Sequence, residues 1–105
     1  MDRLTQLKQF ASEEPNDPFN RYALALEYLK TDPAQAISLF DQLMHTHPNY
    51  LPTYYPFAQL LIELKSVEKA EQIFLAGIEM AKTNGDAKTL KELMSAYQDW
   101  MYERG

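Results

Sequence analysis

The chain has 105 residues, enough for one compact core, and its 15 acidic and 10 basic residues leave a net charge of −5. Because no basic cluster interrupts this acidic balance, nucleic acid and anionic membranes are excluded as expected partners. The absence of cysteine excludes disulfides, thiolate catalysis and cysteine-based metal sites, and it is typical of a protein of the reducing cytoplasm.

Apolar residues recur every three or four positions from the start of the chain, so the sequence predicts an all-α protein. Prolines in first turns and Asp or Ser at cap positions mark the helix starts. The predicted helices cover residues 2–13, 18–30, 33–45, 52–64, 67–83 and 87–103. The first of them lacks a secretory core, and no apolar run reaches the length that spans a bilayer.

The breaks between these helices repeat. "EPND" at residues 14–17 returns as "HPNY" at residues 47–50, and "RYALALEY" at 21–28 returns as "YYPFAQLL" at 54–61, each 33 residues later. The pattern Ala36-x3-Phe40 returns as Ala70-x3-Phe74 after 34 residues, because the earlier turn is one residue shorter. A period of this length indicates stacked repeats.

These spacings resemble the tetratricopeptide repeat, in which two antiparallel helices carry W-x2-L-G-x2-Y, then A-x3-F, then a proline. The resemblance covers residues 18–83 and fits a small protein with two repeats. It implies an all-α, right-handed solenoid of helical hairpins in a single domain, 1–105. Its expected parts are an N-terminal half-repeat helix at 2–15, repeats at 18–50 and 51–84, and a C-terminal capping helix at 86–104.

Three residues depart from the family pattern. Arg21 replaces a large apolar residue, and Lys82 stands where the second repeat should have its proline, so the fifth helix should run on to Gly85. Asp86 should then cap the last helix. Pro56 falls inside the fourth helix, where we expect a kink or a delayed start.

The sequence offers little for catalysis or metal binding. His45 and His47 are two positions apart and would point to different sides of a helix, so we expect no metal and no other cofactor. Glu13 and Glu14 end a helix without a nucleophile or oxyanion donor nearby, and we expect no enzyme.

In the family, the first helices of the repeats line a concave groove. The resemblance places six residues of this chain there: Tyr22, Leu26, Leu29, Tyr55, Gln59 and Ile62. Such an apolar, tyrosine-lined groove would suit a peptide or helix of another protein, rather than the C-terminal carboxylate that Lys and Asn hold in chaperone-binding members. The alternative, that this stripe only packs on flanking helices, stays open.

A second hypothesis is a self-assembling structural unit without a separate ligand. No helix follows residues 87–103 to cover their apolar face. We expect Met94, Trp100 and Met101 to be the apolar side chains that remain uncovered within the chain. These three residues would form the interface of a symmetric homodimer.

Overall fold

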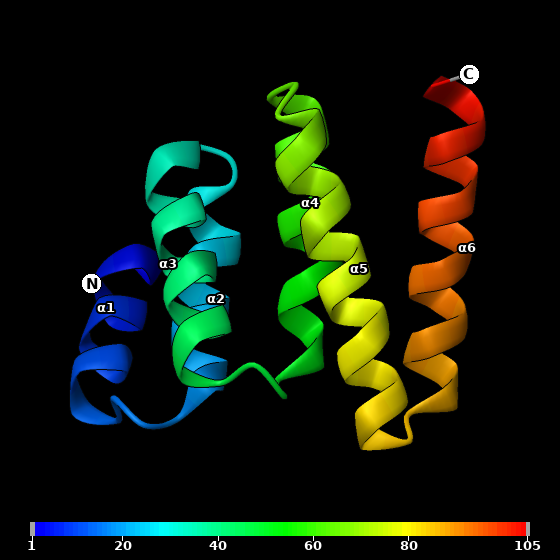
Figure 1. Cartoon of the computed structure of the whole chain (residues 1–105). Coiled ribbons are helices and arrows are strands. Elements are labelled where there is room, and N and C mark those ends of the chain that lie inside the picture. Colours follow the sequence, from blue (N-terminus) through cyan, green and yellow to red (C-terminus); the bar gives the residue numbers. More distant parts are fainter. Residues whose placement is uncertain (1, 105) are drawn as a thin grey trace. The chain divides into compact units, whose positions relative to one another are not determined.

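All regular structure in the described residues, 2–104, is helical in the computed structural model (Figure 1). This confirms the predicted all-α class. The elements are α1 Arg3–Glu13, α2 Pro18–Tyr28, α3 Pro33–Thr46, the 3-10 turn η1 Leu51–Thr53, α4 Tyr54–Glu63, α5 Val67–Asn84 and α6 Ala87–Arg104.

The chain divides into two compact units, Met1–Thr53 and Tyr54–Gly105. In the first unit α2 packs against both α1 and α3. Successive helices run in opposite directions, as predicted for a helical hairpin preceded by half a repeat (Figure 1). One cluster of their core consists of the buried residues Leu7, Ala23 and Leu24, with Leu4, Tyr28 and Leu39 packed on them. Phe40 of α3 is also completely buried.

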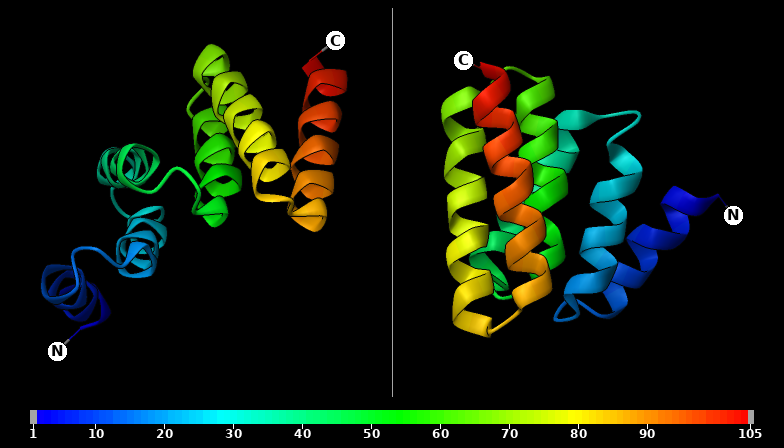
Figure 2. Two further views of the ribbon diagram at one scale, coloured as in Figure 1. Left: turned by 60° about the horizontal axis from the view of Figure 1, so that its bottom comes forward. Right: turned by 90° about the vertical axis from the view of Figure 1, so that its right-hand side faces the viewer.

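In the second unit α5 packs against α4 on one side and α6 on the other. The three helices alternate in direction, so that α4 and α6 run parallel (Figures 1 and 2). Ala58 and Ala70 are completely buried, as expected where two helices of a pair approach closely. Phe74 of α5 packs on Tyr97 and Trp100 of α6, with ring centroids 5.7 Å apart in each case.

Asp residues begin four of the helices described. The carboxylates of Asp2, Asp17, Asp32 and Asp86 accept hydrogen bonds from backbone N–H groups in the first turns of α1, α2, α3 and α6. Ser66 precedes α5 but makes no such side-chain bond. The predicted cap at Asp86 is therefore confirmed, while Ser66 only occupies the cap position.

The two departures in the second repeat have the predicted effects. η1 precedes α4, which starts at Tyr54, so Pro56 is its third residue and lacks an N–H that would have no partner within the helix. The start of α4 is therefore delayed. At the other end, α5 continues to Asn84, and Gly85 adopts the left-handed conformation with φ of 70°.

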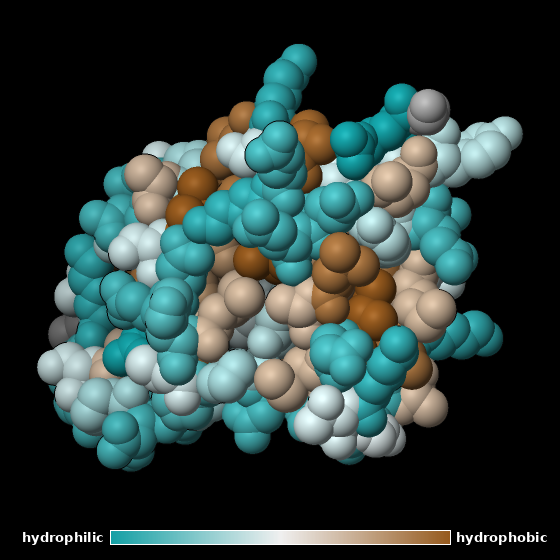
Figure 3. Space-filling view, viewed as in Figure 1, coloured by the Kyte–Doolittle hydropathy of each residue, from teal (hydrophilic) through white to brown (hydrophobic). Residues whose placement is uncertain are grey.

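Figure 3 shows hydrophobic residues over the middle of α5, surrounded by hydrophilic ones. Leu75 of α5 is among the large apolar side chains that remain exposed. Within residues 2–104, no helix combines the length and the apolar character needed to cross a membrane.

Candidate functional site

A groove runs between the parallel helices α4 and α6. Tyr55, Gln59 and Ile62 lie on one face of α4 and line a pocket of about 290 Å³. A second pocket, of about 690 Å³, shares Tyr55, Ala96 and Asp99 with the first and extends towards the start of α6. We call the two together the α4–α6 groove. Its α6 side consists of Lys88, Lys91, Glu92, Ser95, Ala96, Asp99, Trp100 and Glu103.

Helix α5 sets the distance between the two walls of this groove. Gly77 of α5 allows Tyr54 of α4 to approach its backbone closely, because a Cβ atom there would lie 2.7 Å from the Cβ of Tyr54. On the α6 side, Tyr97 donates a hydrogen bond from its hydroxyl to Glu71 Oε2 at 3.0 Å. Burial, followed by this bond and the charge of Glu71, raises the pKa of Tyr97.

The predicted binding residues of the second unit thus lie together. Tyr55 is 48% exposed and contributes to both pockets, while Gln59 and Ile62 are half-buried. Tyr55 therefore combines a large accessible ring with a fixed position on a helix. Aromatic side chains in such settings provide much contact area with little loss of rotamer freedom.

The predicted binding residues of the first unit are partly covered. Tyr22 packs edge-on against Tyr50, with ring centroids 5.6 Å apart, and burial raises its pKa. Leu26 of the same helix and Leu29, which directly follows the helix, are half-buried. Part of this stripe therefore serves packing within its own unit.

The three residues predicted to form a dimer interface differ from one another. Met94 and Met101 are each 38% exposed, whereas Trp100 is only 9% exposed. Trp100 is held by Phe74 on α5 and carries the guanidinium of Arg104 at 4.8 Å from its ring centroid. The expectation that Trp100 is surplus apolar surface is corrected, because α5 already covers it.

The side chains of His45 and His47 make different contacts. His47 lies within hydrogen-bonding distance of the backbone oxygen of Asn16, with its Nε2 at 3.0 Å, so it ties the end of α3 to the preceding Pro-Asn turn. His45 stays close to its own helix, with Nδ1 2.9 Å from the carbonyl oxygen of Asp41. No cluster of three potential metal ligands occurs in the part of the chain that the structure describes.

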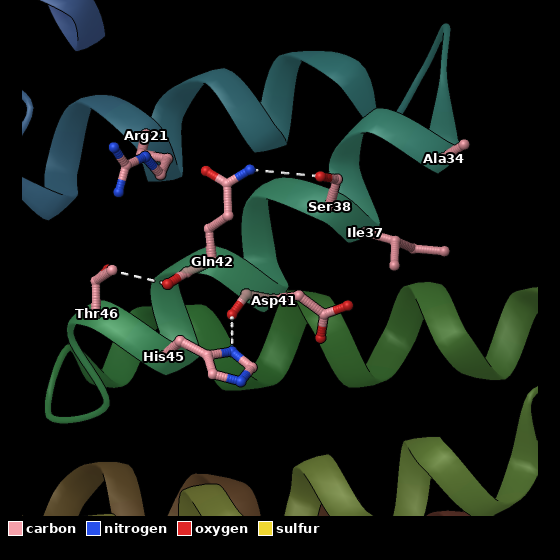
Figure 4. A pocket seen from close by; sticks show the side chains of 8 residues that line it. All are labelled: Arg21, Ala34, Ile37, Ser38, Asp41, Gln42, His45 and Thr46. Carbon is pink, nitrogen blue, oxygen red and sulfur yellow. Dashed lines mark hydrogen bonds between the residues drawn. The ribbon is translucent and has the colours of Figure 1, made fainter.

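A further pocket of about 640 Å³ lies beside α3 in the first unit (Figure 4). Its lining is Arg21, Ala34, Ile37, Ser38, Asp41, Gln42, His45 and Thr46. Several of its polar groups bond within α3, as in the bond of Thr46 Oγ1 to the carbonyl oxygen of Gln42. These bonds hold the side chains against their own helix.

The contribution of α6 to the groove was missed in the sequence, although a signal was present. The frame Leu90-x2-Leu93-Met94-x2-Tyr97 repeats that of residues 54–61 after 36 positions. Applied to Tyr55 and Gln59, the same offset gives Lys91 and Ser95, and both line the groove. Extending the repeat register to α6 would have found them.

Comparison with known proteins gives the family and the fold of this chain. The family model of the tetratricopeptide repeat matches residues 28–94. A solution NMR structure of a tetratricopeptide repeat domain protein from Salinibacter ruber is similar, with 42% identity and a TM-score of 0.76 over 81% of this chain and 87% of that one. A crystal structure described as the tetratricopeptide repeat domain protein from the same organism has 42% identity and a TM-score of 0.72, over 79% and 93% of the two chains. None of the curated proteins matches the sequence.

Proposed function

The chain belongs to the tetratricopeptide repeat family, and we propose that it is a non-enzymatic module that binds a peptide or helix of another protein through its Tyr55-lined groove. Repeats of this family are in general protein-interaction scaffolds without catalytic activity, and they present extended concave surfaces to their partners. The absence of cysteine supports our further proposal that the protein works in the reducing cytoplasm.

The observation that carries the proposal is the exposure of Tyr55 between two pockets of one groove. An aromatic residue in the folded core would be covered by its neighbours, yet Tyr55 is about half exposed. Ile62 and Ala96 add apolar surface beside it, and Gln59 adds a side chain that can both donate and accept hydrogen bonds. This mixture of an apolar floor and a few polar groups is typical of peptide-binding grooves.

The test is affinity capture with the full chain and with the Tyr55→Ala variant, followed by mass spectrometry. We expect the variant to lose the partners that the original chain recovers, and Tyr22→Ala combined with Tyr55→Ala to lose at least as many. Tyr102→Ala is the matched control, because Tyr102 is 89% exposed and does not line the groove. Unchanged recovery by Tyr55→Ala, with its helical circular dichroism retained, would count against the proposal.

Self-association is a second candidate function, and the exposure of Met94 and Met101 favours it. The two residues are seven positions apart and so share one face of α6. Flexible methionine side chains adapt easily to an apolar partner surface. The burial of Trp100 weakens this candidate relative to the groove, because it removes the aromatic anchor from the face.

A further inference from the structure

The charges along the α4–α6 groove are unevenly distributed. The groove-lining residues of α6 recur at intervals of three and four, so they form one continuous face of that helix. Lys88, Lys91 and Glu92 lie at its beginning, and Asp99 and Glu103 lie near its end. The group of Lys88, Lys91 and Glu92 lies about 16 Å along the helix axis from the pair of Asp99 and Glu103.

At the acidic end the groove is apolar as well as negative. Its pocket of about 290 Å³ is lined by Ile62 and Trp100 in addition to the two carboxylates. A whole helix is about 10–12 Å in diameter and would not enter a pocket of this volume. A single long side chain from an extended segment would fit, with its aliphatic part on the apolar lining.

The carboxylates of Asp99 and Glu103 do not stabilise helix α6. Asp99 and Glu103 are four positions apart, where like charges repel each other, and they lie towards the helix C-terminus, where negative charge is disfavoured by the helix dipole. Arg104, the nearest cation in sequence, lies over Trp100 and 4.0 Å from Glu71. Its guanidinium is therefore engaged with the α5 side of α6.

At the opposite end of the groove, the positive and negative charges nearly cancel. Asp86 lies beside the start of α6, and its pKa is lowered mainly by hydrogen bonds from Thr89 and to a smaller extent by the positive charge of Lys88. Glu92 and Asp99 line the same pocket as Lys88 and Lys91, so two carboxylates offset two ammonium groups there. A cationic group of a ligand is thus attracted to the smaller pocket, which holds Asp99 and Glu103 and no basic side chain among its described residues, rather than to the pocket that holds Lys91.

We infer that the α4–α6 groove binds an extended peptide segment with a large apolar side chain over Tyr55 and an Arg or Lys two or three residues away. The basic side chain lies along Ile62 and Trp100, and its charged end lies between Asp99 and Glu103. Two or three residues of extended chain span about 7–10 Å, which is the length of one to two turns of α6. This inference rests on the proposed function, and it names the partner chemistry.

The experiment is selection from a phage-displayed library of random twelve-residue peptides on the immobilised full chain. The selected peptides are then made with both ends blocked, so that any charge preference comes from side chains. We expect enrichment of a large apolar residue with Arg or Lys two or three positions from it. Affinity, measured by fluorescence anisotropy at low salt, should fall about three- to tenfold in the Asp99→Asn, Glu103→Gln double variant.

The matched control is the Glu68→Gln, Glu79→Gln double variant, which removes the same charge from exposed positions of α5 outside the groove. It should bind the selected peptides as the original chain does. Enriched peptides without a basic residue, or equal affinity for both double variants, would overturn the inference. If Tyr55→Ala still abolishes binding in that case, the proposed function stands. If no peptide is enriched over the Tyr55→Ala chain, both are wrong.

Discussion

Gly77 is the residue whose importance is least visible in the sequence. A Cβ atom there would lie 2.7 Å and 2.8 Å from Cβ and Cγ of Tyr54 and 3.1 Å from Leu93 Cδ1. The first two atoms are close to the backbone of α4 and cannot move away cheaply. We predict that Gly77→Ala lowers the free energy of unfolding by about 2 kcal/mol, despite the better helix propensity of alanine.

Urea unfolding followed by circular dichroism measures this loss. A double-mutant cycle with Tyr54→Ala supplies the control, because removing the Tyr54 ring should make Gly77→Ala less costly. Equal costs in both backgrounds would contradict the proposed contact.

Lys65 and Gly85 end α4 and α5 in the same left-handed conformation, with φ of 62° and 70°. In both turns the following residue donates its N–H back to the helix: Ser66 to Leu61 at 2.8 Å, and Asp86 to Ala81 at 3.0 Å. A side chain in this conformation costs about 1 kcal/mol relative to glycine. We therefore predict that Lys65→Gly stabilises the protein by about 1 kcal/mol and that Gly85→Ala destabilises it by a similar amount.

Thermal and urea unfolding of the two variants give the measurement. Space is not the cause at Gly85, because nothing lies within 4 Å of an added Cβ. Shifts of the same sign in the two variants would refute the conformational explanation.

Asp86 makes the stability of α6 depend on pH. Its carboxylate accepts hydrogen bonds from the Thr89 backbone N–H and hydroxyl, each at 2.9 Å, and these lower its pKa below 3.8. Because the pKa of Asp86 is lowered in the folded state, its carboxylate stabilises the folded protein fully above pH 3.8, the pKa of an ordinary Asp. This stabilisation is lost as the pH falls through the lower pKa of the folded state. Asp86→Asn keeps a cap without the charge, so we predict a smaller loss of stability on acidification. Identical urea midpoints for both chains across pH 5 to 2 would contradict this prediction.

At the scale of helices, the sequence predicted most of the fold because capping and periodicity act locally. Residues 67–83 were predicted as one helix and α5 is Val67–Asn84, since no proline interrupts it before Gly85. The sequence also predicted that the turn after α2 is one residue shorter than the turn after α4, and the two turns differ in backbone conformation. In the described chain positive φ occurs at Lys65 and Gly85 and not between α2 and α3, so the first hairpin lacks the left-handed residue of the second.

The position of α6 on α5 depends on contacts that local sequence does not reveal. Tyr97 reaches Glu71 across 26 positions, and Trp100 packs on Phe74. We predict that Tyr97→Phe lowers the free energy of unfolding by about 1 kcal/mol, because the Glu71 carboxylate loses its hydroxyl donor. Glu71→Gln should cost less, since an amide oxygen still accepts the bond. Urea unfolding measures both losses. A larger loss of stability in Glu71→Gln than in Tyr97→Phe would show that the hydrogen bond between these side chains does not account for the stabilisation.

For the molecule as a whole, the candidate site was predictable in part. The stripe of Tyr55, Gln59 and Ile62 follows from helical spacing and the repeat register. The opposite wall of the groove was not predicted, because the repeat register was not extended to Lys91 and Ser95 of α6. Packing of α6 on the preceding helix was considered for other apolar residues, but not for Trp100. The same gap explains the error over Trp100, whose burial depends on Phe74, 26 residues earlier in the chain.

The self-association hypothesis is tested at this same scale. The exposed apolar surface on its face of α6 is limited to Met94 and Met101, well short of the roughly 1,200 Å² that stable specific interfaces usually bury. We therefore predict at most a weak homodimer, detected by light scattering at high protein concentration and dissociating on dilution to the micromolar range. Met94→Glu combined with Met101→Glu should give a monomer at every concentration, because apposed carboxylates would replace the apolar contact. Tyr102→Glu is a control for added negative charge, since it places a carboxylate on the same helix at an exposed position outside this pair. A monomer mass for the original chain at its highest attainable concentration would remove self-association and leave peptide binding as the function to pursue.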